Sequence, residues 1–439
     1  MALLDKFEAA VAIRDQLQAG GHDPTKVVIE RIISPTEGIV DGRHTILAGT
    51  NNYLGLTFDP ACVEAAQKAV QQQGTGTTGS RMANGSFASH TALEQELADF
   101  FGTTYGMVFS TGYAANLGTL TALLKPGDAV LLDADAHASL YDGCQMSGAD
   151  IFRFRHNDVG SLEKRLQRLA ERAQDCLIIT EGLYSVLGDC APLVEIVRLK
   201  KQYGAMLLVD EAHSLGVYGD RGCGVAQAQG VMDQVDFFVG TFSKSLGAMG
   251  GFCVSPHAEL ELIRYVSRPF IFTASSSPSI IASTHEALRQ LKTRPELREA
   301  LWRNARRLYE GFKSHGFEVG PEVSPVVAVC LGQKEVALPF WNRLLEKGVY
   351  TNLMIPPASP DRHSYIRCSV SAAHTQQQVE QIIEAFVGAN SVREHYKSGA
   401  DSFATSRAVR LKASKEARTA ASPGPVNPVR GVNRKNIDK

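Results

Sequence analysis

Six short apolar segments between residues 105 and 255 constrain the fold more than any other feature of this sequence. They are YGMVFS (105–110), AVLLDA (129–134), CLIITE (176–181), AMLLVD (205–210), DFFVGT (236–241) and GGFCVS (250–255). Five of them are continuously apolar instead of alternating with polar residues, which is typical of strands buried on both faces. Helical patterns separate most of the segments. The sequence therefore predicts a mostly parallel sheet in a doubly wound α/β domain.

The chain of 439 residues is long enough for two domains and additional terminal segments. After Pro278 the pattern changes to helices at 279–292, 297–315 and 375–388 and strands at 326–331 and 365–370, which predicts a smaller α+β domain. We expect four parts: an N-terminal arm (1–45), a large α/β domain (46–278), a small C-terminal α+β domain (279–390) and a tail (391–439).

The N-terminal arm is predicted to contain an amphipathic helix and a short extended piece that ends at the turn Asp41-Gly42-Arg43. Beyond the arm, Asp59 and Pro60 predict the start of a helix that continues to about Gln73, because Asp is a favoured N-cap and Pro a favoured first helical residue.

The tail differs from the rest of the chain in composition. Residues 393–439 contain eleven Lys or Arg and four Asp or Glu, although the whole chain has a net charge of -1. We expect residues 391–439 to be basic and disordered. Two interpretations stay open: a solvated end, or a weak attraction to anionic lipid of at most about 1 kcal/mol per cation.

The composition also bears on location and partners. The 44% hydrophobic and 21% charged residues describe a globular protein without an overall positive charge that would recruit nucleic acid. The eight cysteines form no CxxC pair and no Cys/His cluster at ligand spacing, so we expect no metal site and a reducing environment. The sequence shows neither a signal-peptide core nor a membrane span, which predicts a cytoplasmic protein with at most peripheral contact to the inner membrane.

Two short stretches of the sequence match nucleotide-binding motifs, but neither has the surrounding sequence that nucleotide binding requires. Asp210-Glu211-Ala212-His213 matches a helicase signature, yet the sequence has no Gly-Lys dipeptide and hence no GxxxxGK[ST] phosphate loop. Residues 74–79 match GxGxxG, but they follow a helix and lead into a turn, whereas a dinucleotide fingerprint follows a strand and opens a helix. A glycine loop where backbone approaches another group closely explains residues 74–79 better.

Lys244 follows a buried strand and is surrounded in sequence by Thr241, Ser243 and several glycines. A lysine in this place is badly placed as a solvated charge and well placed to form a Schiff base. The hydroxyls before it can bind a phosphate, and the glycines allow a planar group to approach the backbone. Taken alone, the motif is equally compatible with a lysine that pairs with a buried acid.

The other strand ends favour the Schiff base. Pyridoxal 5'-phosphate needs an amine, a carboxylate at its ring nitrogen, a phosphate cradle and a group stacked on its ring. Asp210 could hold the ring nitrogen, His213 could reach the ring hydroxyl and His137 could lie on the ring face, since all three follow strands at one sheet edge. The segment FSTGYAANLG (109–118) is a strand, a turn and a helix start, which predicts an anion site. Glu211 is expected to be structural.

The motifs GTFSKSLGAMGGF, VDEAHSLGVYG, STGYAANLG, DADAHASLYDG, TGSRMANGS and TNNYLGL resemble those of the α-oxoamine synthases, which are fold-type-I pyridoxal phosphate enzymes. The resemblance covers residues 1 to about 390. Ser243 before the lysine and the SRMANG loop are most similar to the soluble bacterial serine palmitoyltransferases, whereas the relatives that form other amino ketones usually carry Gly before the lysine.

The resemblance implies a role for each matching residue. Lys244 would form the Schiff base with the cofactor, Asp210 would hold the pyridinium, His213 would contact the ring oxygen and His137 would stack on the ring. The residues Gly112, Tyr113, Thr241 and Ser243 would hold the cofactor and its phosphate, and a homodimer with shared sites would add Thr273 from the partner subunit. Asn52 would lie near the substrate, and Arg367 would pair with the amino-acid carboxylate, for which a forked guanidinium is suited.

The implied reaction is a decarboxylative condensation of L-serine with a long-chain acyl thioester, carried by CoA or by an acyl carrier protein, to 3-ketosphinganine. One departure concerns Ile355, which stands where soluble bacterial relatives can carry an Arg before a PPATP-like loop, so carboxylate binding would depend more on Arg367. Two alternatives stay open: an α-oxoamine synthase that uses glycine or alanine, and a non-catalytic partner subunit, although the latter would be expected to lack Lys244.

Overall fold

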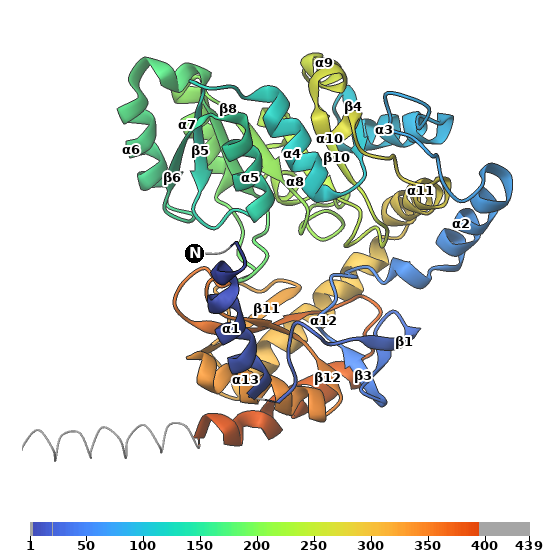
Figure 1. The fold of residues 1–439 in the computed structure, drawn as a ribbon, viewed down its shortest axis with the longest axis vertical. Coiled ribbons are helices and arrows are strands. Elements are labelled where there is room, and N and C mark those ends of the chain that lie inside the picture. Colours follow the sequence, from blue (N-terminus) through green and yellow to red (C-terminus); the bar gives the residue numbers. More distant parts are fainter. Residues whose placement is uncertain (1–2, 20, 395–439) are drawn as a thin grey trace, which may run out of the picture. The chain divides into compact units, whose positions relative to one another are not determined.

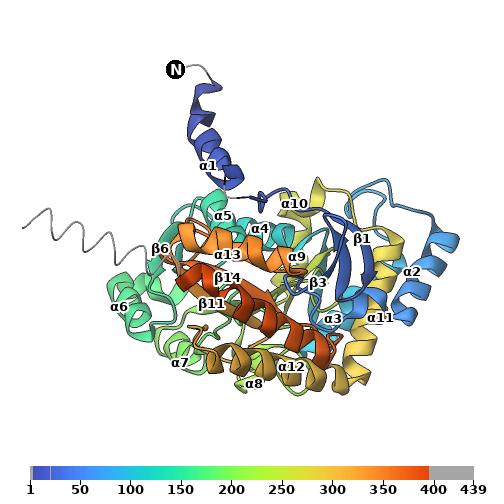
Figure 2. The same cartoon turned by 90° about the horizontal axis from the view of Figure 1, so that it is seen from below.

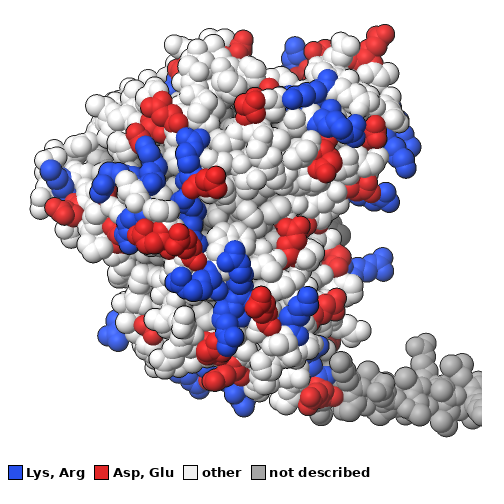
Figure 3. Space-filling model, turned by 180° about the vertical axis from the view of Figure 1, so that it is seen from behind, with Lys and Arg blue, Asp and Glu red and all other residues white. Residues whose placement is uncertain are grey.

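The computed structural model describes residues 3–19 and 21–394. One compact unit extends to Ala389. The predicted disordered basic tail begins at residue 391, but residues 391–394 are helical, so the prediction is wrong for these four residues; from residue 395 onward it falls outside the described residues. No helix in the described part of the chain combines the length and the apolar composition needed to cross a membrane. On the face shown in Figure 3, acidic and basic side chains are interspersed.

The central feature is a seven-stranded sheet with the order β4-β10-β9-β8-β7-β5-β6. Its strands are β4 (Tyr105–Phe109), β10 (Gly251–Ser255), β9 (Phe237–Thr241), β8 (Met206–Asp210), β7 (Leu177–Glu181), β5 (Ala129–Asp133) and β6 (Asp150–Phe154). Only β10 runs against its neighbours β4 and β9. The mostly parallel sheet predicted from the six apolar segments is therefore confirmed, and each of these segments is a strand.

The seventh strand, β6, was not predicted from the sequence. It lies at the edge of the sheet, where Asp150 and Arg153 are exposed, so its sequence DIFRF lacks the continuous apolar character of the buried strands. Edge strands commonly carry charged residues, which hides them from a search for apolar runs.

Helices cover the sheet and enclose the core of the large domain (Figure 1). They include α4 (Gly112–Leu123), α5 (Ala138–Ser147), α6 (Val159–Leu169) and α7 (Leu193–Tyr203); α4 packs against α5, and α6 packs against α7. The core between sheet and helices contains fully buried side chains from several elements, among them Leu120, Val130, Leu208, Val239 and Cys253. The burial of both sheet faces explains the continuously apolar strands.

The C-terminal part of the unit is built on a three-stranded antiparallel sheet of β11 (Val326–Gly332), β14 (Ser364–Ser369) and β13 (Asn352–Met354). The helices α11 (Pro278–Thr293), α12 (Pro295–Ser314) and α13 (Lys334–Glu346) and the helical residues 376–389 accompany it. Figure 2 shows α12 and α13 beside β11 and β14. The α13 helix was not predicted; it contains Pro339 in its interior and is held by buried Phe340 and Leu344.

The N-terminal residues form more structure than the predicted helix and extended piece. The helix is α1 (Glu8–Ala19), and the strands β1 (Ile29–Ser34), β2 (Glu37–Val40) and β3 (Arg43–Leu47) pair antiparallel. Asp41 and Gly42 have φ angles of 50° and 71° and form a two-residue hairpin turn, as expected for these residue types. β3 also pairs parallel with β12 (Val349–Tyr350), which joins the start of the chain to its C-terminal part. The predicted division at residue 45 falls inside β3, and the four-part division stays a prediction.

The α2 helix (Pro60–Gln73) begins as predicted. The Asp59 carboxylate accepts hydrogen bonds from the backbone N–H groups of Ala61 (3.0 Å) and Cys62 (3.3 Å). Its second oxygen accepts a bond from Arg294 at 2.8 Å, which ties α2 to the α11–α12 connection.

We expect Asp59→Ala to lower the free energy of unfolding by about 1–2 kcal/mol, because the variant loses both the helix cap and the ion pair. The matched control Asp59→Asn keeps the capping oxygen and loses only the charge, so its loss should be at most about 1 kcal/mol. Urea titration measures both values. Equal losses in the two variants would contradict a role for Asp59 as a helix cap.

Candidate active site

A cavity of about 290 Å³ lies at the carboxyl ends of the parallel strands. Eight residues predicted for the site line this cavity together: Gly112, Tyr113, His137, Asp210, His213, Thr241, Ser243 and Lys244. Three others, Asn52, Thr273 and Arg367, are not among the lining residues. The strand ends therefore converge as the parallel topology requires.

Lys244 follows β9, and charges of both signs act on its side-chain amine: Asp210 and Glu181 are acidic, and Arg367 is basic. Burial lowers the pKa of the Lys244 ammonium to about 8, although the negative charges of Asp210 and Glu181 act in the opposite direction. A lysine with this pKa is largely neutral just above pH 8, whereas an ordinary lysine is protonated there. A neutral amine is the form that reacts with a carbonyl group or accepts a proton.

Asp210 ends β8 and is held by two hydrogen bonds. One carboxylate oxygen accepts the backbone N–H of Ala212 and the other accepts the side-chain amide of Asn116, both at 2.9 Å. The same Asn116 amide donates to the hydroxyl of Ser139 at 2.9 Å. The sequence did not single out Asn116, which lies inside α4 and meets Asp210 only through the fold.

His137 is positioned by two neighbours that were also not predicted. Its backbone N–H donates to the Glu181 carboxylate at 2.6 Å, and its Nδ1 lies 2.7 Å from the Ser139 hydroxyl. Burial lowers the pKa of the His137 imidazole, which favours the neutral ring. Burial raises the pKa of Glu181 well above its ordinary range, and the charge of Asp210 adds to this effect. Glu181 ends β7 as Asp210 ends β8, so an acid at the end of an apolar strand was the signal that could have identified it.

His213 is in direct contact with Tyr53. The Tyr53 hydroxyl lies 2.8 Å from Nδ1 of His213, and both side chains are buried. Burial lowers the pKa of His213 well below its ordinary value, and the cations Lys244 and Arg367 contribute to this effect. His213 is therefore a neutral hydrogen-bonding group. Tyr53 belongs to the TNNYLGL motif, but the sequence did not indicate its partner.

The cradle predicted for an anion is present at the start of α4. Thr111 caps the helix by accepting the N–H of Ala114. A Cβ atom on Gly112 would lie 2.8 Å from Cβ of Thr241, so only glycine fits this place. The hydroxyls of Thr241 and Ser243 lie 2.9 Å apart and face the same cavity. Helix N–H groups together with hydroxyls form an anion site.

Comparison with known proteins identifies the relatives of this chain. The model of the family Aminotransferase class I and II matches residues 43–386. The serine palmitoyltransferase of Caulobacter vibrioides is 54% identical over 386 residues, which cover 88% of this chain and 96% of that protein. The serine palmitoyltransferase of Sphingomonas paucimobilis is 50% identical over 390 residues, with coverages of 88% and 93%. A solved structure of SPT with PLP internal aldimine has a TM-score of 0.87 and 49% identity, and covers 90% of this chain and 100% of that chain.

The chain belongs to the aminotransferase class I and II family. Its relatives place it in the α-oxoamine synthase branch of this family, as the motifs indicated. The prediction of the fold-type-I architecture is confirmed as well.

Two further residues predicted for this α-oxoamine synthase carry buried polar atoms without a partner among the described residues. Arg367, in β14, donates to Asn51 and to the hydroxyl of Ser369 at 3.1 Å, but its buried Nε has no acceptor. Asn52 donates to Thr57 at 2.8 Å, and its buried Oδ1 has no donor. The charge of Arg367 contributes to lowering the pKa of Lys244, which places it near the cavity that it does not line.

Glu211 has the structural role expected from the sequence. Its carboxylate accepts the backbone N–H groups of Val225 (3.0 Å) and Ala226 (2.9 Å) at the start of the short α8 helix (Val225–Ala228), and it also binds the Ser214 hydroxyl. Burial raises the pKa of Glu211 to about 7. The two acids of the helicase-like motif therefore have different roles, since Asp210 lines the cavity and Glu211 does not.

The pKa of Lys244 predicts how this α-oxoamine synthase reacts with an aldehyde. Below pH 8 the amine is protonated and unreactive, and above pH 8 it is neutral. We expect the rate of Schiff-base formation between cofactor-free protein and added pyridoxal 5'-phosphate to rise with pH and to level off above about pH 8–9. Stopped-flow absorbance between pH 6.5 and 10 measures it. A rate that still rises tenfold per pH unit above pH 9 would show an ordinary lysine.

Proposed function

We propose that this chain catalyses the pyridoxal phosphate-dependent condensation of L-serine with a long-chain acyl thioester. The products would be 3-ketosphinganine, CO2 and the free thiol. One observation carries the proposal: Lys244 lines a single cavity with Asp210, His137, His213 and the anion cradle at Gly112. The activity named for the relatives that are 54% and 50% identical supports the choice of substrates.

The residues of the cavity fit pyridoxal 5'-phosphate. The Gly112 cradle and the hydroxyls of Thr241 and Ser243 would hold the phosphate, and Asp210 would accept a hydrogen bond from the ring nitrogen. When bound, the cofactor supplies an aldehyde for the amino group and a ring that accepts the electron pair released at the substrate Cα.

Lys244 is suited to move the Cα proton of the amino acid. Because burial lowers its pKa to about 8, the amine can accept a proton near neutral pH and give it up again later in the reaction. The nearby carboxylates of Asp210 and Glu181 stabilise the ammonium that forms. Lys244 would therefore act both as the amine that binds the cofactor and as the general base.

The two histidines contribute as neutral groups. His137 is fixed by Ser139 and, through its backbone, by Glu181, so its ring has one orientation in the cavity. His213 is fixed by Tyr53. A histidine held in a single orientation can pack on a planar group or hydrogen-bond to it without paying the entropy of ordering. In this proposal His137 covers the ring of the cofactor and His213 binds the ring oxygen.

Arg367 is the group proposed to bind the carboxylate of serine. Its unpartnered Nε and its charge suit a carboxylate, and Ile355 offers no second cation at the place where relatives can carry an Arg. Asn52, with its free Oδ1, would lie near the same substrate.

Thr273 is exposed and does not line the cavity of its own chain. This placement supports the proposal that it completes the phosphate site of the partner in a homodimer. As further parts of the proposal, the acyl donor is a CoA ester or a carrier-protein ester, and the basic tail adds peripheral contact with an anionic membrane.

The two rival functions are less well supported. The relatives that are 50–54% identical are serine palmitoyltransferases, which does not favour a synthase that uses glycine or alanine. A non-catalytic partner subunit has no need of a lysine with a lowered pKa beside a complete set of supporting groups.

The substrate proposal is tested by turnover with serine, glycine and alanine, each with palmitoyl-CoA and with palmitoyl carrier protein. Release of thiol and of CO2 is measured. We expect serine to be preferred over both other amino acids with at least one of the donors. Faster turnover with glycine or alanine would contradict the proposal.

We expect Lys244→Ala to remain folded, to lack the visible absorbance of the lysine Schiff base and to lose turnover by at least about a thousandfold, since it removes both the amine and the base. Absorption spectra and thiol release measure these losses. A variant that kept the absorbance and turned over would refute the role of Lys244.

We expect Arg367→Lys to raise the KM for serine about 10- to 100-fold and to leave the KM for the acyl donor within about twofold, because a lysine keeps the charge but loses the fork. Arg362→Lys is the matched control, because Arg362 is exposed nearby in the sequence. Steady-state kinetics at varied serine concentration measure the KM for serine in both variants. An unchanged KM for serine in Arg367→Lys would exclude Arg367 from carboxylate binding.

A further inference from the structure

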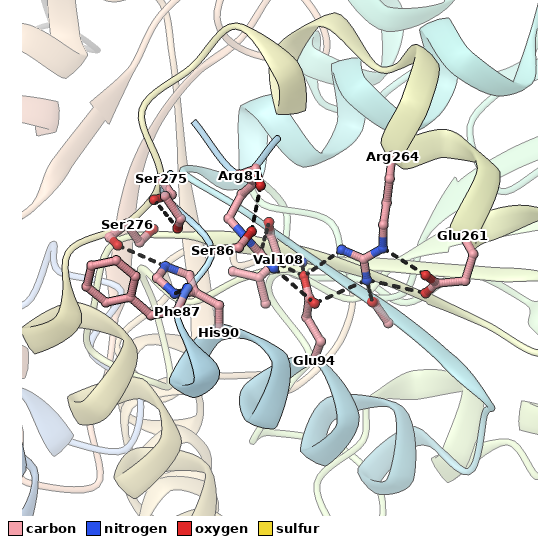
Figure 4. A network of polar contacts seen from close by, with 12 residues as sticks. Arg81, Ser86, Phe87, His90, Glu94, Val108, Glu261, Arg264, Ser275 and Ser276 are labelled. Atoms are coloured by element: carbon pink, nitrogen blue, oxygen red, sulfur yellow. Dashed lines mark hydrogen bonds and ion pairs between the residues drawn. The ribbon is translucent and has the colours of Figure 1, made fainter. Parts of the chain in front are cut away.

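A buried ion network lies outside the cavity and has no part in the mechanism proposed above. Its centre is Glu94 in α3 (Ala88–Phe101), which binds two arginines (Figure 4). Arg81 donates two bonds to the Glu94 carboxylate, at 2.7 and 3.1 Å, and Arg264 donates two more, at 3.2 and 3.1 Å. The backbone N–H of Val108 adds a fifth bond at 2.9 Å. A single carboxylate thus joins the loop that follows α2, the strand β4 and the helix α9 (Glu259–Val266).

The network is charged and largely shielded from water. The side chains of Arg81 and Glu94 are 6% and 5% exposed, and that of Arg264 is 22% exposed. Burial by itself would raise the pKa of Glu94, but the hydrogen bonds and charges of Arg81 and Arg264 outweigh burial and lower it. Glu261 binds Arg264 at the outer end of the network, at 2.9 Å, and is 45% exposed. Buried ion pairs are weak evidence for stability, but they fix geometry because breaking one leaves an uncompensated charge.

The Arg81 end of the network holds a loop, residues 74–87, which contains the glycine motif at residues 74–79. Arg81 binds the hydroxyl of Ser86 at 3.0 Å, and the same hydroxyl donates to the backbone oxygen of Arg81. Thr78 in this loop has a φ of 60°, an unfavourable value for a β-branched residue, and Asn84 holds it through a bond of 3.1 Å to its hydroxyl. A strained residue that its surroundings keep in place is typical of functional segments.

This loop is connected to the segment that carries Thr273. Ser275 binds the backbone oxygen of Gly85 at 2.7 Å, and Ser80 forms an isolated β-bridge with Ala274. His90 lies 3.0 Å from the backbone oxygen of Ser276. Both guanidinium groups also face the ring of Phe270, three residues before Thr273: that of Arg81 at 5.3 Å and that of Arg264 at 5.6 Å from its centre.

The same segments expose large apolar side chains. Met82 (58% exposed) follows Arg81, Tyr265 (70%) and Val266 (60%) follow Arg264, and Phe272 (73%) precedes Thr273. These side chains flank the segments that the network holds, and exposed apolar surface is a common feature of the faces by which proteins bind one another. If a second copy of the chain covers this surface, Thr273 also gains a function, because it does not line the cavity of its own chain.

We propose that the Arg81–Glu94–Arg264 network is a positioning device that acts on the partner subunit. It would fix the glycine-rich loop and the Thr273 segment of one subunit where they complete the cofactor site of the other. The inference rests on the proposed function and adds to it a set of residues that touches neither substrate nor cofactor. The chemistry at Lys244 in one subunit would then depend on Glu94 of its partner.

Heterodimers test this dependence. Two differently tagged copies, one with Glu94→Gln and one with Lys244→Ala, are co-expressed and the mixed dimer is purified by both tags. We expect the Glu94→Gln homodimer to bind pyridoxal phosphate about tenfold more weakly, because its amide presents a donor to two guanidinium donors. In the mixed dimer, the only cavity with a lysine belongs to the Glu94→Gln copy and receives the intact segment from the Lys244→Ala copy. This cavity should regain the cofactor affinity and the turnover per site of the unmodified dimer.

Persistence of the weak binding in the mixed dimer would show that Glu94 acts within its own subunit and would overturn the inference. A mixed dimer of Lys244→Ala with His137→Ala is the negative control, since both residues serve the same cavity and no intact site forms. Glu261→Gln is the matched control for Glu94→Gln, because it removes the exposed acid at the outer end and should change cofactor affinity by no more than about twofold.

If Glu94→Gln does not fold, as judged by circular dichroism, Arg81→Lys takes its place in the same mixed dimer, with the same two outcomes. A protein that is monomeric in light scattering while active would also overturn the inference. Activity in the Lys244→Ala homodimer would instead overturn the proposed function, so the two failures are distinct.

Discussion

The amine of Lys244 is held beside two buried carboxylates at the edge of a parallel sheet, and the arrangement of the site depends on this balance of charge. Burial disfavours the ammonium and lowers its pKa, the charges of Asp210 and Glu181 oppose this decrease, and the net result is a pKa of about 8. Parallel strands make this possible because β7, β8 and β9 all direct their carboxyl ends to one edge. β7 and β8 therefore end in the acids Glu181 and Asp210 at this edge, and Lys244 lies just beyond the end of β9.

The hydrogen bonds around the site hold its other groups in single orientations. The bonds of Asp210 to Asn116 and Ala212 occupy one lone pair on each oxygen and fix the plane of the carboxylate. His137 and His213 are buried, so both favour the neutral ring, and each is oriented by a hydroxyl group. A site in which each group has one state needs little reorganisation when charge develops during a reaction.

Several contacts of the fold and site could not be predicted from local patterns. The bond between Asn116 and Asp210 spans 94 residues, the contact between Tyr53 and His213 spans 160, and the bond between Glu94 and Arg264 spans 170. No periodicity or spacing encodes such pairs, because each member is compatible with many partners until the chain is folded. Local patterns did not predict the edge strand β6 or the helix α13. Exposed charges interrupt the apolar pattern of β6, and Pro339 interrupts the helical pattern of α13.

The sequence by itself determined where six strands of the central sheet lie along the chain, since strands covered on both faces are continuously apolar. It also determined which residue types follow those strands, and the combination of a lysine, an aspartate, two histidines and a glycine cradle restricted the chemistry to a few classes. The tertiary structure decided which of these residues meet and what state they are in. Burial and neighbouring charge set the pKa values of Lys244, His213 and Glu181, and both depend on side chains that only folding brings together.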